Sequence, residues 1–157
     1  LAVAWAACGQ ERVLATPLQM ALVAAAVANG GEIMVPYVVE EVRTRDGRVV
    51  DEAKPSRWST AMDPQTASTL NEMMRRVVTS GTGTGAAIEG VEVAGKTGTA
   101  ERGDSTNLAW FIGFAPASDP EVAVAVVVED TLATGGAEAA PLAAKVMRAA
   151  LAAGRRP

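Results

Sequence analysis

The stretch GVEVAGKTGTAE, residues 90–101, decides between two folds. Counted from Gly90, it matches the phosphate-binding pattern G-x-x-x-x-G-K-T, which predicts a glycine-rich loop before a helix. Counted from Lys96, it contains K-T-G-T, a pattern typical of a strand that binds a carboxylate. The two interpretations exclude each other, so the flanking residues must decide between them.

The flanking residues favour the strand. A phosphate-binding loop needs a bend followed at once by a helix whose N-terminus faces the anion. Residues 91–94, VEVA, alternate as a strand does, whereas residues 98–104 contain two glycines and no apolar period. No helix is therefore expected after Thr97, and the nucleotide-binding interpretation is disfavoured.

A strand over this stretch predicts the directions of four side chains. Side chains alternate along a strand, so Lys96 and Gly98 point to one face while Thr97 and Thr99 point to the other. Gly98 leaves room for another backbone to approach. Two hydroxyls beside an ammonium group suit an extended peptide that ends in a carboxylate.

Composition narrows the possible chemistry. The chain has 157 residues, is 49% apolar and carries a net charge of −4, which argues for one core and against nucleic acid as a partner. It has one cysteine and no histidine, which excludes disulfide frameworks, Cys/His metal sites and histidine-based triads. We expect no metal and no cofactor. Cys8, in an apolar run, is interpreted as a small buried residue.

The first residues show no targeting segment. The chain begins at Leu1 without a basic region before an apolar one, so no signal peptide is visible. Apolar runs such as MALVAAAVA, residues 20–28, are shorter than the roughly twenty residues that a membrane helix needs. We therefore expect a piece of a longer protein, with any export signal or membrane anchor upstream.

Three segments carry helix signals. Residues 17–28 follow the cap Thr16 and are apolar nearly all round, which predicts a helix covered on several sides. Residues 63–81 begin with the cap Asp63 and have one apolar stripe, which predicts an amphipathic helix. A third helix is expected over residues 139–153.

Extended segments complete an α+β pattern, an antiparallel sheet flanked by helices. Residues 37–52 predict a hairpin that turns at residues 45–47. Three more strands, over residues 91–99, 108–116 and 121–130, are joined by short connections and are therefore expected to be antiparallel neighbours. The last of them is almost wholly apolar, as expected of a central strand covered on both faces.

Five blocks occur in an order that resembles a known family. They are GQERVLATPLQMALVAAAVANGG, GTGTGAAIEG, VAGKTGTAE, AWFIGFAP and VAVAVVVE. Together they resemble the C-terminal half of a penicillin-binding protein transpeptidase domain, of the monofunctional high-molecular-weight class. The resemblance implies that residues 1–157 are the C-terminal portion of a single transpeptidase domain. It also implies that residues 91–130 supply the last three strands of a sheet of about five, between helical layers.

The resemblance also implies an activity, peptidoglycan D,D-transpeptidation. In this family a serine of an S-x-x-K motif attacks the D-Ala-D-Ala carbonyl of a stem peptide, and a second stem peptide takes the acyl group. β-Lactams trap the acyl-enzyme. Such enzymes lie at the extracytoplasmic face of the bacterial plasma membrane, anchored there with partners in cell-wall synthesis.

Roles for four residues follow from the family's pattern. Lys96 is expected to contact the serine of an S-x-N motif and to supply positive potential. Thr97 and Thr99 are expected to hold the substrate carboxylate, and the Thr99 N–H to be an oxyanion donor, so that Lys96 and Thr99 are the catalytic candidates. Gly98 is expected to keep the substrate groove open.

The chain departs from the family's pattern in one respect. It contains no S-x-x-K motif, and its formal S-x-N, residues 105–107, follows K-T-G in a turn instead of preceding it. We interpret residues 105–107 as a hydrogen-bonding loop. The nucleophile and its base are therefore expected upstream, in the missing half of the domain, and this chain alone is expected to be inactive.

Two other functions remain open at this point. One is a non-catalytic transpeptidase-like module that serves as a β-lactam sensor or scaffold, and the other is a fragment of a serine β-lactamase. The upstream sequence would separate the scaffold from the transpeptidase, because a scaffold can lack S-x-x-K altogether. A β-lactamase would need a deacylating base, which this segment does not reveal. An isolated half would also expose apolar faces and tend to self-associate.

Overall fold

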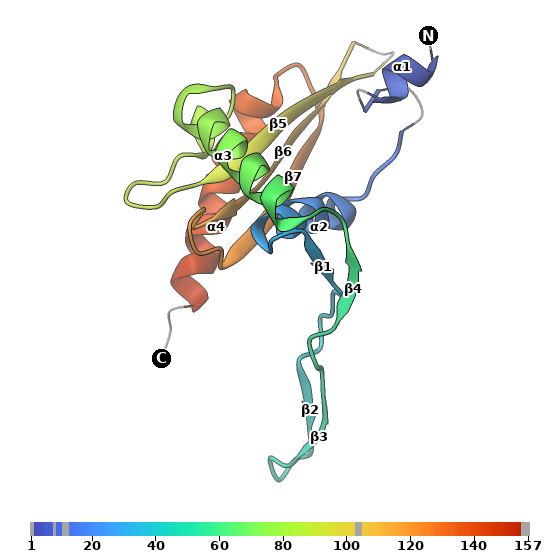
Figure 1. Cartoon of the computed structure of the whole chain (residues 1–157), viewed down its shortest axis with the longest axis vertical. Coiled ribbons are helices and arrows are strands. Elements are labelled where there is room, and N and C mark those ends of the chain that lie inside the picture. The colour runs from blue at the N-terminus through green and yellow to red at the C-terminus, as the bar shows by residue number, and fades with distance from the viewer. Residues whose placement is uncertain (1, 8, 11–12, 103–104, 155–157) are drawn as a thin grey trace.

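A three-stranded antiparallel sheet lies at the centre of the structure, in the order β5-β6-β7 (Figure 1). Its strands are β5 (Ala94–Glu101), β6 (Asn107–Ala115) and β7 (Val122–Thr131). The structure, a computed structural model, describes residues 2–7, 9–10, 13–102 and 105–154. The predicted antiparallel neighbours are thus confirmed, although β5 begins three residues later than expected, after an isolated bridge between Ile88 and Val91.

Helices cover both faces of this sheet. Helix α2 (Pro17–Ala28) packs on β6 and β7, and α3 (Pro64–Ser80) lies along β5. Helix α4 (Ala140–Gly154), which follows a π-helical turn η2 (Gly135–Ala139), packs on the opposite face (Figure 1). The short elements α1 (Ala2–Ala7) and η1 (Thr84–Ala86) complete the helical part. The α+β fold, an antiparallel sheet flanked by helices, is confirmed.

Two apolar clusters, one on each face, form the core. Phe114 points toward α2 and packs with Ala24 and Val27. Phe111, an odd number of residues away, points to the other face and packs with Met147 of α4. Alternation along β6 therefore fixes which helix each face receives.

The Phe111 ring lies against two glycines, Gly95 on the neighbouring strand β5 and Gly113 on its own strand β6. A Cβ on Gly95 would stand 2.1 Å from Phe111 Cζ, and a Cβ on Gly113 would stand 2.8 Å from Phe111 Cε1. Phe111 itself is fully buried. Gly95 therefore needs to be glycine because the ring takes the space of a side chain, and at Gly113 the Ala94 carbonyl oxygen, 2.5 Å from an added Cβ, takes that space together with the ring.

We expect Gly95→Ala to destabilise the fold by about 1–3 kcal/mol, since the added carbon overpacks a buried ring. The unfolding midpoint of the full-length protein in guanidinium chloride measures the change. Gly154→Ala is the matched control, because a Cβ there meets nothing within 4 Å. Equal midpoints for both variants would contradict this account of the Phe111 packing.

The helix starts follow the predicted caps. Thr16 and Gln19 form a capping box at the start of α2. Asp63 accepts from the Thr66 amide at the start of α3, and this bond, with one from the Thr66 hydroxyl, holds the pKa of the Asp63 carboxyl below its ordinary value.

Two expectations about coverage were wrong for the described residues. Helix α2 is not covered on several sides: Leu18 is 57% exposed and Val23 46% exposed. Strand β7 contacts both α2 and α4 but lies at an edge of the sheet, and most of its side chains are only half-buried. Apolar composition predicted the need for cover, but among the described residues one side of α2 stays exposed and β7 has a strand neighbour on one edge only.

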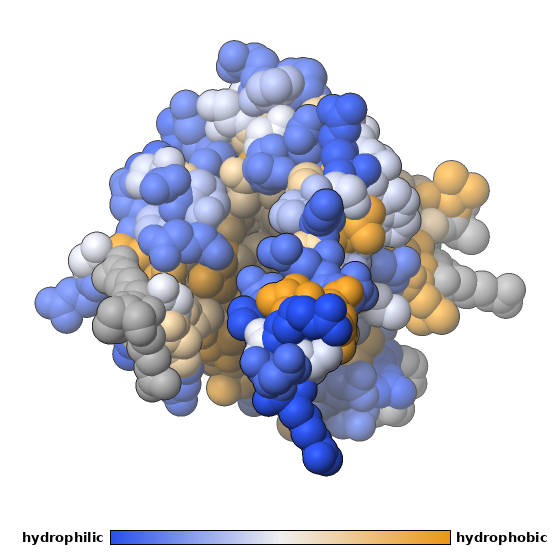
Figure 2. All heavy atoms as spheres, turned by 90° about the horizontal axis from the view of Figure 1, so that it is seen from below, coloured by the Kyte–Doolittle hydropathy of each residue, from blue (hydrophilic) through white to orange (hydrophobic). Residues whose placement is uncertain are grey.

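A long two-stranded ribbon projects from this body (Figure 1). Its base pairs β1 (Glu32–Met34) with β4 (Arg57–Thr60), and its tip pairs β2 (Glu41–Arg43) with β3 (Val49–Glu52). Figure 2 shows the hydrophilic tip in front, with hydrophobic residues of the ribbon behind it. The predicted hairpin over residues 37–52 is confirmed, with Gly47 at a φ of 86° in its turn.

The expectations for Cys8 and for the β5–β6 connection concern residues that lie wholly or partly outside the described ranges. Cys8 lies outside the described residues, as do residues 103–104 of the β5–β6 connection. Ser105, with a φ of 70°, lies in that connection, as expected of a turn residue.

Candidate active site

Lys96, Thr97, Gly98 and Thr99 lie on β5, at an edge of the sheet. Their partners on β6 alternate: Lys96 and Gly98 pair with Ile112 and Trp110, while Thr97 and Thr99 pair with Phe111 and Ala109. The stretch forms no loop before a helix, so the nucleotide-binding interpretation is excluded for this fold.

Directions on the strand agree with the predicted alternation. Phe111 faces α4, so its partner Thr97 lies on that face, and Thr99 follows two residues later. Lys96 lies on the face of α2 and is exposed. The ammonium and the two hydroxyls therefore approach the open edge from opposite faces of the strand.

Both threonine hydroxyls have a partner from outside the strand. Thr97 Oγ1 lies 2.6 Å from Thr82 Oγ1, in the segment after α3. Thr99 Oγ1 accepts from the Gly135 amide at 3.2 Å. A hydroxyl has one proton and two lone pairs, so the Thr99 hydroxyl keeps its proton for an anion at the edge.

The backbone of Thr99 also faces the open edge. Gln10 Nε2 donates to the Thr99 carbonyl at 3.4 Å, so this carbonyl points away from β6. The N–H and C=O of one strand residue share a direction, hence the Thr99 N–H points outward as well. It can donate to an extended peptide or to an oxygen that becomes negatively charged.

Lys96 carries the positive charge of this edge. Its Nζ donates to the carbonyl of Thr97 at 2.7 Å. None of the ion pairs between described residues includes Lys96. Its charge therefore remains available to an anionic ligand or to a second polar group.

A close backbone approach does occur here, but from the face opposite to the one that the sequence predicted. A Cβ on Gly98 would point toward Trp110 and would meet Trp110 Cβ at 3.3 Å. On the other face, a Cβ on Gly135 would stand 2.3 Å from the Gly98 carbonyl oxygen and 2.2 Å from that of Trp110. Gly135 is thus the residue whose lack of a side chain lets two backbones touch.

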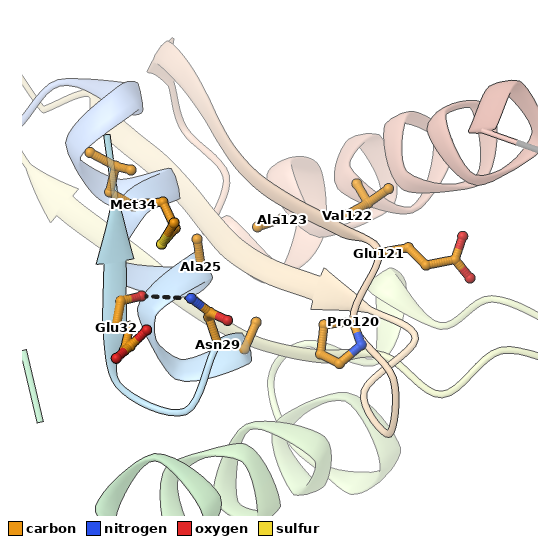
Figure 3. Close-up of a pocket in the computed structure, with 10 residues that line it drawn as sticks. Ala25, Asn29, Glu32, Met34, Pro120, Glu121, Val122 and Ala123 are labelled. Atoms are coloured by element: carbon orange, nitrogen blue, oxygen red, sulfur yellow. Dashed lines mark hydrogen bonds between the residues drawn. The ribbon is translucent and has the colours of Figure 1, made fainter. Parts of the chain in front are cut away.

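Several cavities lined by described residues lie near the sheet, and one of them includes a candidate residue. A cavity of about 250 Å³ includes Thr99, Trp110 and Met20 in its lining, together with Gln10 and its neighbours. A second, of about 360 Å³, lies between α2, β1 and the β6–β7 turn, where Asn29 donates to the Glu32 carbonyl (Figure 3). The first is therefore the better candidate for substrate contacts.

The chain matches the penicillin binding protein transpeptidase domain over residues 2–148, most of its length. The chain belongs to this family. Its edge strand with K-T-G-T is therefore the family's motif, in the strand that the resemblance implied.

Curated relatives agree with this membership. Peptidoglycan D,D-transpeptidase PbpA of Mycolicibacterium smegmatis is 48% identical over 153 residues, covering 91% of this chain and 30% of the relative. Stage V sporulation protein D of Bacillus subtilis is 34% identical and covers 90% of the chain and 23% of the relative. The chain thus spans less than a third of the length of these relatives.

Solved structures of the family superpose well. The D,D-transpeptidase domain of a peptidoglycan glycosyltransferase from Eggerthella lenta gives a TM-score of 0.83 at 43% identity, covering 90% of this chain and 33% of that one. The imipenem acyl-enzyme complex of penicillin-binding protein A from M. tuberculosis gives 0.81 at 43% identity, covering 91% and 32%. This chain is similar to part of each domain.

Sequence reasoning missed Thr82 and Gly135. They stand 15 and 36 positions from the threonines that they contact. Their only signals are the glycine-rich runs around them, residues 81–85 and 135–136.

In the part of the chain that the structure describes, no helix is both long and apolar enough to cross a membrane.

Proposed function

We propose that this chain is the C-terminal portion of a single peptidoglycan D,D-transpeptidase domain whose serine nucleophile and base lie on an upstream segment. The observation that carries this proposal is the K-T-G-T edge strand. Its open edge offers an ammonium that forms no ion pair with the described residues, a hydroxyl proton and an outward N–H. Relatives that are called peptidoglycan D,D-transpeptidases support the reaction type.

The roles of Lys96, Thr97, Gly98 and Thr99 follow from their places on the open edge of β5. Lys96 supplies positive potential and contacts a polar group of the upstream segment. Thr97 and Thr99 donate to the terminal carboxylate of the stem peptide, and Gly98 leaves the groove open beside Trp110. The outward Thr99 N–H stabilises the oxyanion of the tetrahedral intermediate together with a donor from the upstream segment.

Partners and location are part of the proposal. The donor substrate is a stem peptide ending in D-Ala-D-Ala, and β-lactams occupy the same open edge. Acyl-enzyme complexes with imipenem and ceftriaxone are known for penicillin-binding protein A of M. tuberculosis, which supports the second point. The full-length protein then acts at the extracytoplasmic face of the plasma membrane, anchored by upstream sequence.

The missing half of the domain also accounts for the uncovered apolar surface. Leu18 and Val23 on α2, and the outer edge of β7, are the faces that it would cover. This chain expressed alone is then inactive and prone to self-association.

The test is covalent labelling of the full-length protein with a fluorescent penicillin, followed by incubation with stem pentapeptides. We expect a stable adduct and, without penicillin, cross-linked peptide dimers. An adduct without dimers would favour a β-lactam sensor, and rapid loss of the adduct by hydrolysis would favour a β-lactamase. Absence of any adduct would refute the transpeptidase, the β-lactam sensor and the β-lactamase, and would favour a non-catalytic scaffold.

A further inference from the structure

The hydroxyl of Thr82 contacts the candidate substrate-binding residues from outside the K-T-G-T motif. Thr82 lies between the end of α3 and η1, and its Oγ1 is 2.6 Å from Oγ1 of Thr97. Both side chains are accessible at the surface, Thr82 more so than Thr97. This contact joins the α3–β5 connection to the edge that is proposed to hold the carboxylate.

The direction of this hydrogen bond decides what Thr97 offers to an anion. Each hydroxyl has one proton, so one of the two threonines donates and the other accepts. When Thr97 donates to Thr82, only lone pairs of Thr97 remain, and these repel a carboxylate. When Thr82 donates, the Thr97 proton is free to bind the carboxylate in a charge-assisted bond.

Thr99 already has this arrangement, with a backbone donor in place of a hydroxyl. The Gly135 amide occupies a lone pair of the Thr99 hydroxyl at 3.2 Å and cannot accept in return. Thr82 can play the same part for Thr97. The hydroxyls of Thr97 and Thr99 thus each form a hydrogen bond with a residue of a different connection, Thr82 for Thr97 and Gly135 for Thr99.

Backbone contacts on both sides of Thr82 hold the chain in place at this residue. The amides of Gly81 and Gly83, on either side, both donate to the Val77 carbonyl, at 3.1 and 2.9 Å. A Cβ on Gly136 would stand 2.2 Å from the Thr82 carbonyl oxygen, so that segment packs directly on it. The backbone position from which the Thr82 hydroxyl reaches Thr97 is therefore set by the fold.

We propose that Thr82 is a positioning residue that donates to Thr97 and so orients the Thr97 proton toward the substrate carboxylate. This inference rests on the proposed transpeptidase function. It concerns acylation by ligands that carry a carboxylate, and it predicts no effect on ligands without one.

The experiment measures the second-order rate of acylation of the full-length protein by benzylpenicillin and by its methyl ester. We expect Thr82→Val to slow acylation by benzylpenicillin about tenfold, the order expected for one hydrogen bond that supports a charged group. Thr82→Ser, which restores the hydroxyl, is expected to return the rate to near the wild-type value. The methyl ester should react equally with all three proteins.

A double-mutant cycle tests the pairing with Thr97. In a Thr97→Val background, Thr82→Val should change the rate less than about twofold, because its partner is gone. In a Thr99→Val background, Thr82→Val should still slow acylation by benzylpenicillin about tenfold. Thr69→Val, an exposed threonine on α3 whose hydroxyl bonds to the Gln65 carbonyl, is the control.

The outcomes separate this inference from the function on which it rests. Wild-type rates in Thr82→Val, or an equal loss with the methyl ester, would overturn the positioning role while the transpeptidase proposal stands. A wild-type protein that formed no adduct with either compound would overturn both.

Discussion

Lys96→Ala in the full-length protein is expected to slow labelling by a fluorescent penicillin at least about a hundredfold, the loss typical of a preorganised electrostatic group. The Lys96 ammonium forms no ion pair among the described residues, and its bond to the Thr97 carbonyl keeps it against the strand. Its removal deletes the positive charge at the edge where a carboxylate is proposed to bind.

Lys145→Ala is the matched control, since Lys145 is an exposed lysine of α4 on the other face of the sheet. It should label at the wild-type rate. Quench-flow or gel-based time courses give both rates, and similar unfolding midpoints would establish that each variant is folded. A Lys96→Ala protein that labels as fast as Lys145→Ala would remove Lys96 from the site.

The second large effect is expected at Thr99, where two substitutions separate the side chain from the backbone. Thr99→Val removes the hydroxyl and its bond from Gly135 but keeps the N–H, and a loss of about tenfold is expected. Thr99→Pro removes the N–H as well, and a further loss of about a hundredfold is expected if that group donates to the oxyanion.

Proline is informative here because β5 is an edge strand. The Thr99 carbonyl accepts from Gln10, so the Thr99 N–H also points away from β6 and its loss breaks no bond of the sheet. The preceding residue, Gly98, is already extended, as a residue before proline prefers. Equal labelling rates for the Pro and Val variants would show that the Thr99 N–H has no part in acylation.

Local signals in the sequence predicted most of the fold. Capping residues located the starts of α2 and α3, and short connections predicted the antiparallel order of β5, β6 and β7. The base of the ribbon escaped prediction, because β1 and β4 are short and pair across 23 or more residues. The exposed side of α2 was not predicted either. An apolar composition indicates that a helix is buried in the whole protein, but it does not indicate which element buries it.

The site was predictable along the strand and not across it. Alternation alone placed Lys96 apart from Thr97 and Thr99, as the register of β5 and β6 confirms. The contacts of Thr82 and Gly135 depend on how the connections fold over the strand, and no local pattern encodes them. The functional roles of Lys96 to Thr99 stay predictions until the variants are measured.

The projecting ribbon has a practical use. It joins the body only through the ends of β1 and β4, and its turn at Asp46 and Gly47 lies far from β5 (Figure 1). Exposed turns of this kind tolerate insertions. An epitope or fluorophore inserted at this turn could be used for microscopy or affinity capture without contacting the candidate site on β5.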